Sequence, residues 1–493
     1  MNKSTIQTLI DKVIGKKGLI RVPSWWMRKV LMQIADWVQE GDDANGEKIV
    51  KVKEEADGKI TTLDNNTKAA LVELKKSLHT QRCIVVKTGA NAGYVVVDGV
   101  KQDIPANTQK IITYVDTFSF YNKSTTNQWL IFIGLAVADA SSITDMSYMF
   151  TSCSGLTSLD LSGFNTSAVT SMSYMFENCS GLTSLDLSGF NTSAVTSMDS
   201  MFYNCTGLTS LDLSGLDTSA ITDMSYMFYS CTGLKSLDLS GLDASAITDM
   251  SYMFAYCSGL TSLDLSGFNT SAVTNMESMF ESCSGLTSLD LSGFNTSAVT
   301  SMSRMFASCS GLKSLDLSGF NTSAVTNMSR MFASCSGLKS LDLSGFNTSA
   351  VTDMSRMFAS CSGLKSLDLS NFDTSKMTSM FEVFYNCSAL TSIDLSSFDT
   401  SKAMIDDMFY GCSAITSLIL GPNFFKTSKT ASLDFSGCTK WTNDTVVTSL
   451  VTNSYDRATA GLSTMTLKLS ANTKAALTDE QKAAITAKGY TIA

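Results

Sequence analysis

The stretch Cys153–Asn178, CSGLTSLDLSGFNTSAVTSMSYMFEN, decides the fold, because it recurs with little change along the chain. Cysteines follow one another every 26 residues from Cys153 to Cys387, and Cys412 and Cys438 continue the series after 25 and 26 residues. A fixed period of this length is the signature of a solenoid, in which each repeat forms one coil. We therefore expect a rod of about 12 coils of 26 residues.

The apolar residues of one repeat indicate what each part of a coil does. Leu156–Leu161 alternates as a strand does, with leucines pointing inward and polar residues outward. Ala168–Thr170 is predicted to be a second short extended segment. Met172–Cys179 has apolar residues at spacings of three and four, which predicts a short helical turn. The expected fold class is therefore an α/β solenoid.

The repeat pattern, LxSLDLSxFxTSxVTxMxxMFxxC, resembles the 26-residue leucine-rich repeat of BspA-like bacterial surface proteins. The resemblance covers roughly residues 130–440. Members of that family occur in bacterial surface proteins and in phage or prophage fibres. The resemblance therefore implies a leucine-rich-repeat rod that binds surfaces and is not an enzyme.

The sequence outside the repeats changes character several times. Leu130 and Ile133 fall one period before Leu156 and Leu159, which predicts a degenerate first coil. Near the C-terminus, Met465–Leu469 alternates as a strand, and a capping box at Thr478–Gln481 starts a helix that ends at Gly489. The predicted domains are a helical attachment head (1–45), a short coiled coil (46–80), a small β domain (81–128), the solenoid (129–440) and a C-terminal cap (441–493).

The N-terminal head is rich in tryptophan, with Trp25, Trp26 and Trp37 in one short segment. We expect these side chains to dock on other virion proteins or between copies of the chain; the alternative is a local core against residues 5–22. Residues 46–80 favour a self-associating coiled coil, or alternatively a single solvated helix. By analogy with fibres, we expect a homotrimer.

Composition restricts the possible partners. The chain has 493 residues, a net charge of −9 and a pI of about 4.8, which disfavours nucleic acid and anionic membranes. No apolar run reaches the length of a membrane span. Residues 1–30 lack an uninterrupted apolar stretch of the kind found in signal peptides, so we expect a virion protein made in the host cytoplasm. Location on the bacterial cell surface is the alternative.

Twelve of the thirteen cysteines share one position of the repeat. The expected state is a buried, reduced ladder, although stacked thiols would be close enough to form bridges. The chain has one histidine and no CxxC pair, so no metal site and no cofactor are expected, apart from weakly bound divalent cations.

One aspartate per coil marks the outer side of the predicted strand. Such a ladder of carboxylates should attract divalent cations weakly or have raised pKa values; the alternative is a solvated polar face. A glycosidase needs two carboxylates in unlike environments, which identical coils do not provide, so a tail-spike-like glycan depolymerase is disfavoured. The column consists of Asp160, Asp186, Asp212, Asp238, Asp264, Asp290, Asp316, Asp342, Asp368 and Asp394.

The position before the recurring Met-Phe pair varies while the core positions barely change. A tyrosine-rich stripe followed by an arginine stripe suits stacking on sugar rings or contact with a protein or an acidic glycan. The alternatives are neutral drift and packing between neighbouring chains. The candidate ligand-binding residues are Tyr148, Tyr174, Tyr226, Tyr252, Arg304, Arg330 and Arg356, with Tyr203, Tyr229 and Tyr256 on the same edge. The sequence thus favours a phage fibre that binds a host surface receptor or glycan, with a bacterial adhesin as the alternative.

Overall fold

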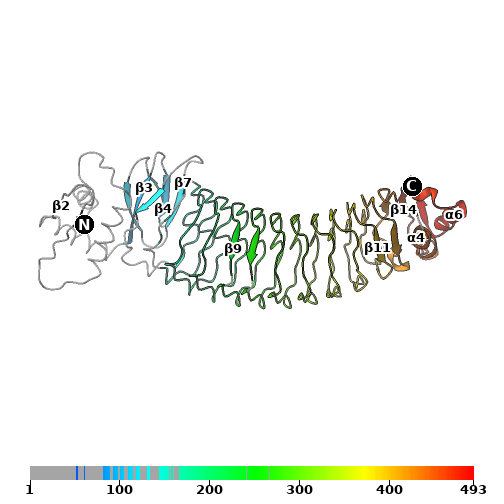
Figure 1. Cartoon of the computed structure of the whole chain (residues 1–493), viewed down its shortest axis with the longest axis horizontal. Coiled ribbons are helices and arrows are strands. Elements are labelled where there is room, and N and C mark those ends of the chain that lie inside the picture. The colour runs from blue at the N-terminus through cyan, green and yellow to red at the C-terminus, as the bar shows by residue number, and fades with distance from the viewer. Residues whose placement is uncertain are drawn as a thin grey trace.

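The computed structural model describes residues 144–493 with their side chains, apart from residues 155, 157–158, 160, 162–165, 240, 266 and 443, and strands between Val52 and Ile133 by their backbone. The predicted head at residues 1–45, with its three tryptophans, lies outside the described residues. The described repeats form a long, gently curved rod (Figure 1). Strands β3, β4 and β7 are drawn at one end of this rod, and the C-terminal elements close the other.

The segment predicted to be a small β domain contains antiparallel strands. Strand β3 pairs with β6 and β8, and β4 pairs with β5 and β7. Val97 pairs with Val100, so Asp98-Gly99 forms a tight hairpin turn between β4 and β5. The strands are β3 (Arg82–Thr88), β4 (Gly93–Val97), β5 (Val100–Ile104), β6 (Gln109–Tyr114), β7 (Phe118–Asn122) and β8 (Leu130–Ile133).

Two predictions in the N-terminal region were wrong at the residues described. Leu130–Ile133 pairs antiparallel with β3, so it belongs to that sheet and is not a coil of the parallel solenoid. Within the predicted coiled coil, β1 (Val52–Lys53) and β2 (Ile60–Thr61) pair antiparallel. The dipeptide Asp57-Gly58 between β1 and β2 favours a hairpin turn.

The coils stack in register, one period apart. A parallel bridge joins Asp145 to Ser171 and Ser171 to Ser197, and the series continues coil by coil to Met404. The N–H of Thr196 donates to the carbonyl of Thr170 at 2.9 Å, and equivalent bonds recur along the rod. The prediction of a tandem 26-residue repeat solenoid is therefore confirmed.

The strand predicted at Leu156–Leu161 is formed only in some coils. Among the described coils, named strands at this position are β9 (Ser236–Asp238), β10 (Ser262–Asp264), β11 (Ser392–Leu395) and β12 (Ser417–Leu420). They pair in parallel register, with Leu237 opposite Leu263 and Ile393 opposite Leu418. The more continuous backbone ladder runs through the other side of the coil, along the Asp145–Ser171 series.

The predicted helical turn at Met172–Cys179 is wrong. This segment consists of successive turns, with positive φ at Tyr174 (58°) and Asn178 (59°). The N–H of Phe176 donates to Met201 in the next coil, whereas the N–H of Met175 donates to Met172 in its own coil. Because the N–H groups alternate between the next coil and the same coil, an α-helical ladder does not form. The spacing of three and four arises from consecutive turns.

The core consists of columns of like side chains. The Phe150, Phe176 and Phe202 rings stack at centroid distances of 5.3 and 5.5 Å, and the column continues to Phe409. The described column cysteines are buried and free, which confirms the reduced ladder. The Cys205 thiol donates to the carbonyl of Phe176 at 3.0 Å, and this contact recurs in neighbouring coils.

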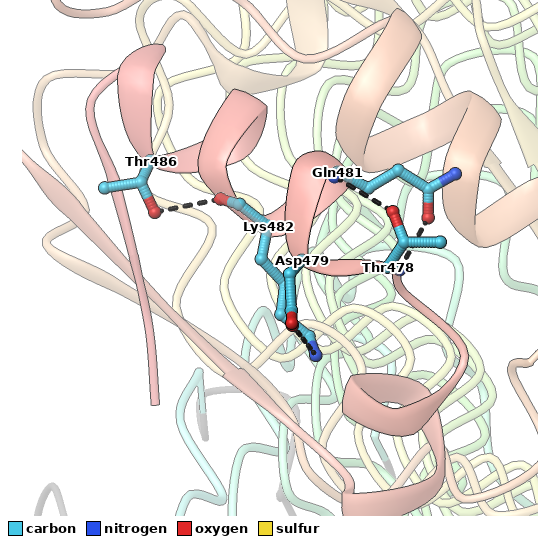
Figure 2. A network of polar contacts seen from close by, with 5 residues as sticks. All are labelled: Thr478, Asp479, Gln481, Lys482 and Thr486. Atoms are coloured by element: carbon cyan, nitrogen blue, oxygen red, sulfur yellow. Dashed lines mark hydrogen bonds and ion pairs between the residues drawn. The ribbon is translucent and has the colours of Figure 1, made fainter.

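The C-terminal elements form a parallel sheet with short helices. Strand β14 and the capping box of α6 are confirmed: the Gln481 N–H donates to Thr478 Oγ1, and the Thr478 N–H donates to Gln481 Oε1 (Figure 2). Gly489 follows at φ 91°. The elements are η2 (Pro422–Phe425), β13 (Ser432–Phe435), α4 (Asp444–Val447), η3 (Thr448–Thr452), β14 (Met465–Leu469), α5 (Ala471–Ala475), α6 (Asp479–Ala487) and β15 (Tyr490–Ile492).

Candidate binding edge

The turns of each coil hold two residues in the left-handed region, and these residues form two columns along one edge of the rod. The first left-handed column precedes the Met-Phe position and has φ values of 52–59°. It contains Tyr148, Tyr174, Ser200, Tyr226, Tyr252, Ser278, Arg304, Arg330, Arg356, Glu382 and Asp407. The second left-handed column lies four residues later and contains Ser152, Asn178, Asn204, Ser230, Tyr256, Ser282, Ser308, Ser334, Ser360, Asn386 and Gly411.

The two columns have the same backbone requirement but different side chains. Glycine and asparagine adopt positive φ most readily, and other L-residues do so at a cost of roughly 1–2 kcal/mol. The second column meets this requirement with Asn178, Asn204, Asn386 and Gly411, and otherwise mostly with serine. The first column instead carries large tyrosine and arginine side chains. Backbone geometry does not explain those side chains, which is the pattern expected where a side chain serves binding.

The structure brings the predicted tyrosines into ring contact. Tyr148 and Tyr174 stack with centroids 4.7 Å apart, and Tyr226 and Tyr252 stack at 4.5 Å. Ser200 is buried and interrupts the column between these two pairs. Burial raises the pKa of Tyr226 to about 12, so its hydroxyl stays protonated at neutral pH.

Tyr203, Tyr229 and Tyr256 widen the second tyrosine pair into a cluster. The Tyr203 and Tyr229 rings stack at 4.6 Å, and Tyr229 lies 5.7 Å from Tyr226. Tyr256 is 39% exposed and contacts Tyr229 at 5.2 Å. We call Tyr203, Tyr226, Tyr229, Tyr252 and Tyr256 the tyrosine cluster. The Tyr252 hydroxyl donates to Glu277 Oε1 at 3.2 Å, and Tyr256 is hydrogen-bonded to Glu281, so the cluster offers a ligand mainly its aromatic rings.

Three arginines continue the first left-handed column beyond the tyrosine cluster. Arg356 is paired: its Nε donates to Glu382 Oε2 at 2.7 Å and its Nη2 to Oε1 at 2.9 Å. Among the described residues, neither Arg304 nor Arg330 forms a salt bridge. Burial, together with repulsion from Arg304 and Arg356, lowers the pKa of Arg330.

The sequence reasoning missed a third group on this edge. Phe381 lies beneath the Arg356 guanidinium at 5.1 Å, and Tyr385 stacks on Tyr410 at 5.1 Å. Phe381 and Glu382 follow Ser355 and Arg356 by one period, so extending the column past Arg356 would have found them.

The aspartate column is exposed, and its described pKa shifts differ from the raised values considered above. The pKa of Asp212 is lowered because the N–H and hydroxyl of Ser214 hydrogen-bond its carboxylate, outweighing repulsion from Asp186 and Asp238. The same cause lowers the pKa of Asp186, Asp290, Asp316, Asp342 and Asp368. Asp160 lies outside the described residues. Weak cation binding by this column stays a prediction.

The described part of the chain offers neither a metal site nor a membrane-spanning helix. In it, no group of three or more His, Cys, Asp or Glu side chains is placed to hold a metal ion. None of its helices has the length and apolar character needed to cross a membrane.

The chain was also compared with known proteins. The family model described as "Mycoplasma protein of unknown function, DUF285" matches three overlapping stretches, residues 117–237, 208–314 and 300–421. Together these stretches span more than half of the chain and include the whole candidate binding edge from Tyr148 to Tyr410. No curated protein matches the chain.

Proposed function

The chain belongs to this repeat family of unknown function, DUF285. We propose that it is a structural adhesion protein, because its repeat resembles that of BspA-like surface proteins. In this proposal it is a phage fibre whose leucine-rich-repeat solenoid binds a receptor or glycan on the host surface. The N-terminal head attaches the fibre to other virion proteins, and copies associate as a homotrimer. The protein would be made in the host cytoplasm and carried on the virion.

The contrast between the two left-handed columns carries this proposal. At the same backbone conformation, the first column has Tyr226, Tyr252 and Arg330, whereas the second has Asn204, Ser230 and Ser334. Replacing the large side chains with asparagine would relieve backbone strain. Stacking of Tyr226 on Tyr252 offsets part of that strain, and contact with a partner is the further reason that we propose for these large side chains.

An asparagine exchange tests the adhesive role. We expect the double variant Y226N/Y252N of the full chain to stay folded, because asparagine suits positive φ, with a melting temperature slightly below that of the wild type because the stacked rings are lost. Its binding to bacterial envelope glycans on an array, and to whole cells, should fall at least about tenfold, the effect of losing roughly 1.4 kcal/mol of aromatic contact.

The matched control is Ser230→Asn in the second left-handed column of the same coil. Asparagine already occupies this column at Asn178 and Asn204, where the Asn204 amide donates to Asn178 Oδ1 at 2.8 Å. This variant should keep both stability and binding. Unchanged binding by Y226N/Y252N, with the fold intact, would contradict an adhesive role for this edge.

A bacterial cell-surface adhesin is the second candidate, because the repeat resembles that of bacterial surface proteins. Antibody labelling separates the two: a fibre protein is found on particles released by lysis, and an adhesin on intact cells. We do not propose catalysis, because the described aspartates of the exposed column share one environment and lack the contrast that acid–base chemistry needs.

A further inference from the structure

The arginine part of the first left-handed column has an unbalanced charge. Glu382 neutralises Arg356 through two hydrogen bonds, whereas Arg304 and Arg330 have no salt bridge among the described residues. The two stand one coil apart, in a chain whose net charge is −9. Aligned like charges repel, and the carboxylates of Glu281 and Glu382 offset this repulsion at Arg330 only in part.

The surroundings of these two arginines are small and polar. The position after the Met-Phe pair is Ala307 and Ala333 here, whereas it is Tyr203 and Tyr229 in the tyrosine cluster. On the other side, the hydroxyl groups of Ser303 and Ser329 lie 3.0 Å apart. The residues next to the arginines in each coil are therefore smaller than those of the tyrosine cluster.

One coil, in which Ser278 is buried, separates the arginines from the tyrosine cluster, and both groups lie on the same edge of the rod. The positive charge of Arg304 acts on Tyr256, although the carboxylate of Glu281 and burial raise the pKa of that tyrosine overall. A ligand lying along the rod can therefore contact aromatic rings and guanidinium groups together. The carboxylates of Glu281 and Glu382 also act on Arg330 and favour its charged form, but burial and the two neighbouring arginines outweigh them.

We propose that Arg304 and Arg330 form an anion subsite that takes the carboxylates of a linear acidic polysaccharide, whose neighbouring sugar rings pack on the tyrosine cluster. Guanidinium groups pair with carboxylates through two parallel hydrogen bonds, and one guanidinium per coil matches a polymer with a regularly repeated carboxylate. The aromatic rings beside the arginines favour a glycan over an acidic peptide. This inference rests on the proposed adhesive function and names its ligand class.

The test measures binding of the full chain to polygalacturonate, with neutral dextran as the comparison probe. The wild type should bind polygalacturonate and not dextran, and binding should weaken as salt is added. The double variant R304Q/R330Q should lose at least about tenfold in affinity, the effect of losing one charge-assisted hydrogen bond of roughly 1.5 kcal/mol. Its melting temperature should equal or slightly exceed that of the wild type, because the repulsion between the two guanidinium groups is removed.

The double variant K313Q/K339Q is the charge-matched control. It removes the same two positive charges from an exposed segment of the corresponding coils, and it should bind as the wild type does. If both double variants lose the same affinity for polygalacturonate, the loss is an effect of net charge, and the proposed anion subsite is wrong. Sedimentation that shows self-association abolished by R304Q/R330Q would also overturn it, because the occupant would then be a second copy of the chain.

The experiments distinguish a failure of the proposed anion subsite from a failure of the proposed adhesive function. If Y226N/Y252N loses cell binding while the wild type does not bind polygalacturonate, the adhesive function stands and the acidic ligand is wrong. If neither pair of substitutions changes cell binding, the adhesive function of this edge fails as well.

Discussion

The thiol of Cys205 donates a hydrogen bond to the carbonyl oxygen of Phe176 at 3.0 Å, and the same contact joins Cys231 to Phe202 at 3.1 Å. Each of these carbonyls also accepts the N–H of the cysteine three residues later in its own coil. The cysteine column therefore links neighbouring coils through the core. Its thiols are structural donors as well as apolar side chains.

Because the thiols of the cysteine column are buried, we expect the fold to lose stability at alkaline pH. Burial raises the pKa of Cys205 from 9.0 to about 12, so the folded protein holds a proton that the unfolded chain releases. Stability is then greatest below pH 9.0 and falls between pH 9.0 and about 12. Melting temperatures measured across this range should drop steeply. The Cys205→Ala variant should be less stable at pH 7 but show a shallower decline.

Alkylation provides an independent check of the same ladder. Because the described column thiols are buried and protonated, iodoacetamide should modify them only after denaturation. Rapid modification of the native protein at several of these sites would contradict the packed ladder.

Two glycines in one coil form a matched pair for testing coil stacking. A Cβ atom at Gly311 would lie 2.3 Å from the carbonyl oxygen of Ser284, whereas at Gly319 it would meet nothing within 4 Å. Gly311→Ala should therefore force the coils apart and cost about 1–3 kcal/mol in the free energy of unfolding. Gly319→Ala should be close to neutral. Denaturant titration of both variants measures the difference, and equal effects would contradict the close approach.

We expect the buried side chain of Arg457 to stabilise the C-terminal cap. This side chain is 1% exposed, and it donates to the carbonyls of Phe425, Thr427 and Ser463. Arg457→Met removes these donors and leaves buried carbonyls unpaired, at about 1–3 kcal/mol for each group. Hydrogen exchange should speed up in β14 and β15 while the central coils stay protected. Unchanged exchange in these strands would show that other contacts hold the cap.

The aspartate column predicts a small response to calcium. Serine hydrogen bonds lower the pKa of Asp316 and Asp342, so these carboxylates stay ionised and repel one another at neutral pH. Millimolar calcium should raise the melting temperature of the wild type, and less so that of D316N/D342N. The stability that their lowered pKa values provide is present above pH 3.8 and is lost as the pH falls through the folded values. A melting temperature that does not change with calcium would contradict cation binding and favour the alternative, a solvated polar face.

The solenoid was predictable because one coil specifies the next. Leu182, Met198, Phe202 and Cys205 each occupy a buried column, so a single period fixed both the register and the core. The path within a coil was less predictable, because left-handed residues at Tyr174 and Asn178 give turns the same spacing as a helix. At Leu130–Ile133 the leucine spacing matched the repeat, but antiparallel pairing with β3 prevailed.

The candidate binding edge was only partly visible in the sequence. Variation before the Met-Phe pair identified Tyr226 and Arg330, but it could not show which arginine is already paired. That distinction depends on the reach of Glu382 across one coil to Arg356. The positive φ values of both columns could not be predicted either, because nothing in the sequence around Tyr252 or Ser230 indicates a left-handed backbone conformation.

We expect the Glu382→Gln variant to bind polygalacturonate more tightly than the wild type, because the substitution removes the ion pair between Glu382 and Arg356. The substitution leaves Arg356 without its carboxylate, so three aligned guanidinium groups face solvent in place of two. The ion pair is partly exposed, and its loss should cost less than about 1 kcal/mol in stability. Affinity for polygalacturonate should rise by about tenfold, since one more charge-assisted pair becomes available. In the triple variant R304Q/R330Q/E382Q the gain should largely disappear, because a single guanidinium cannot hold successive carboxylates. An E382Q protein that binds no more tightly than the wild type would mean that Arg356 lies beyond the reach of the ligand, and that the subsite ends at Arg330.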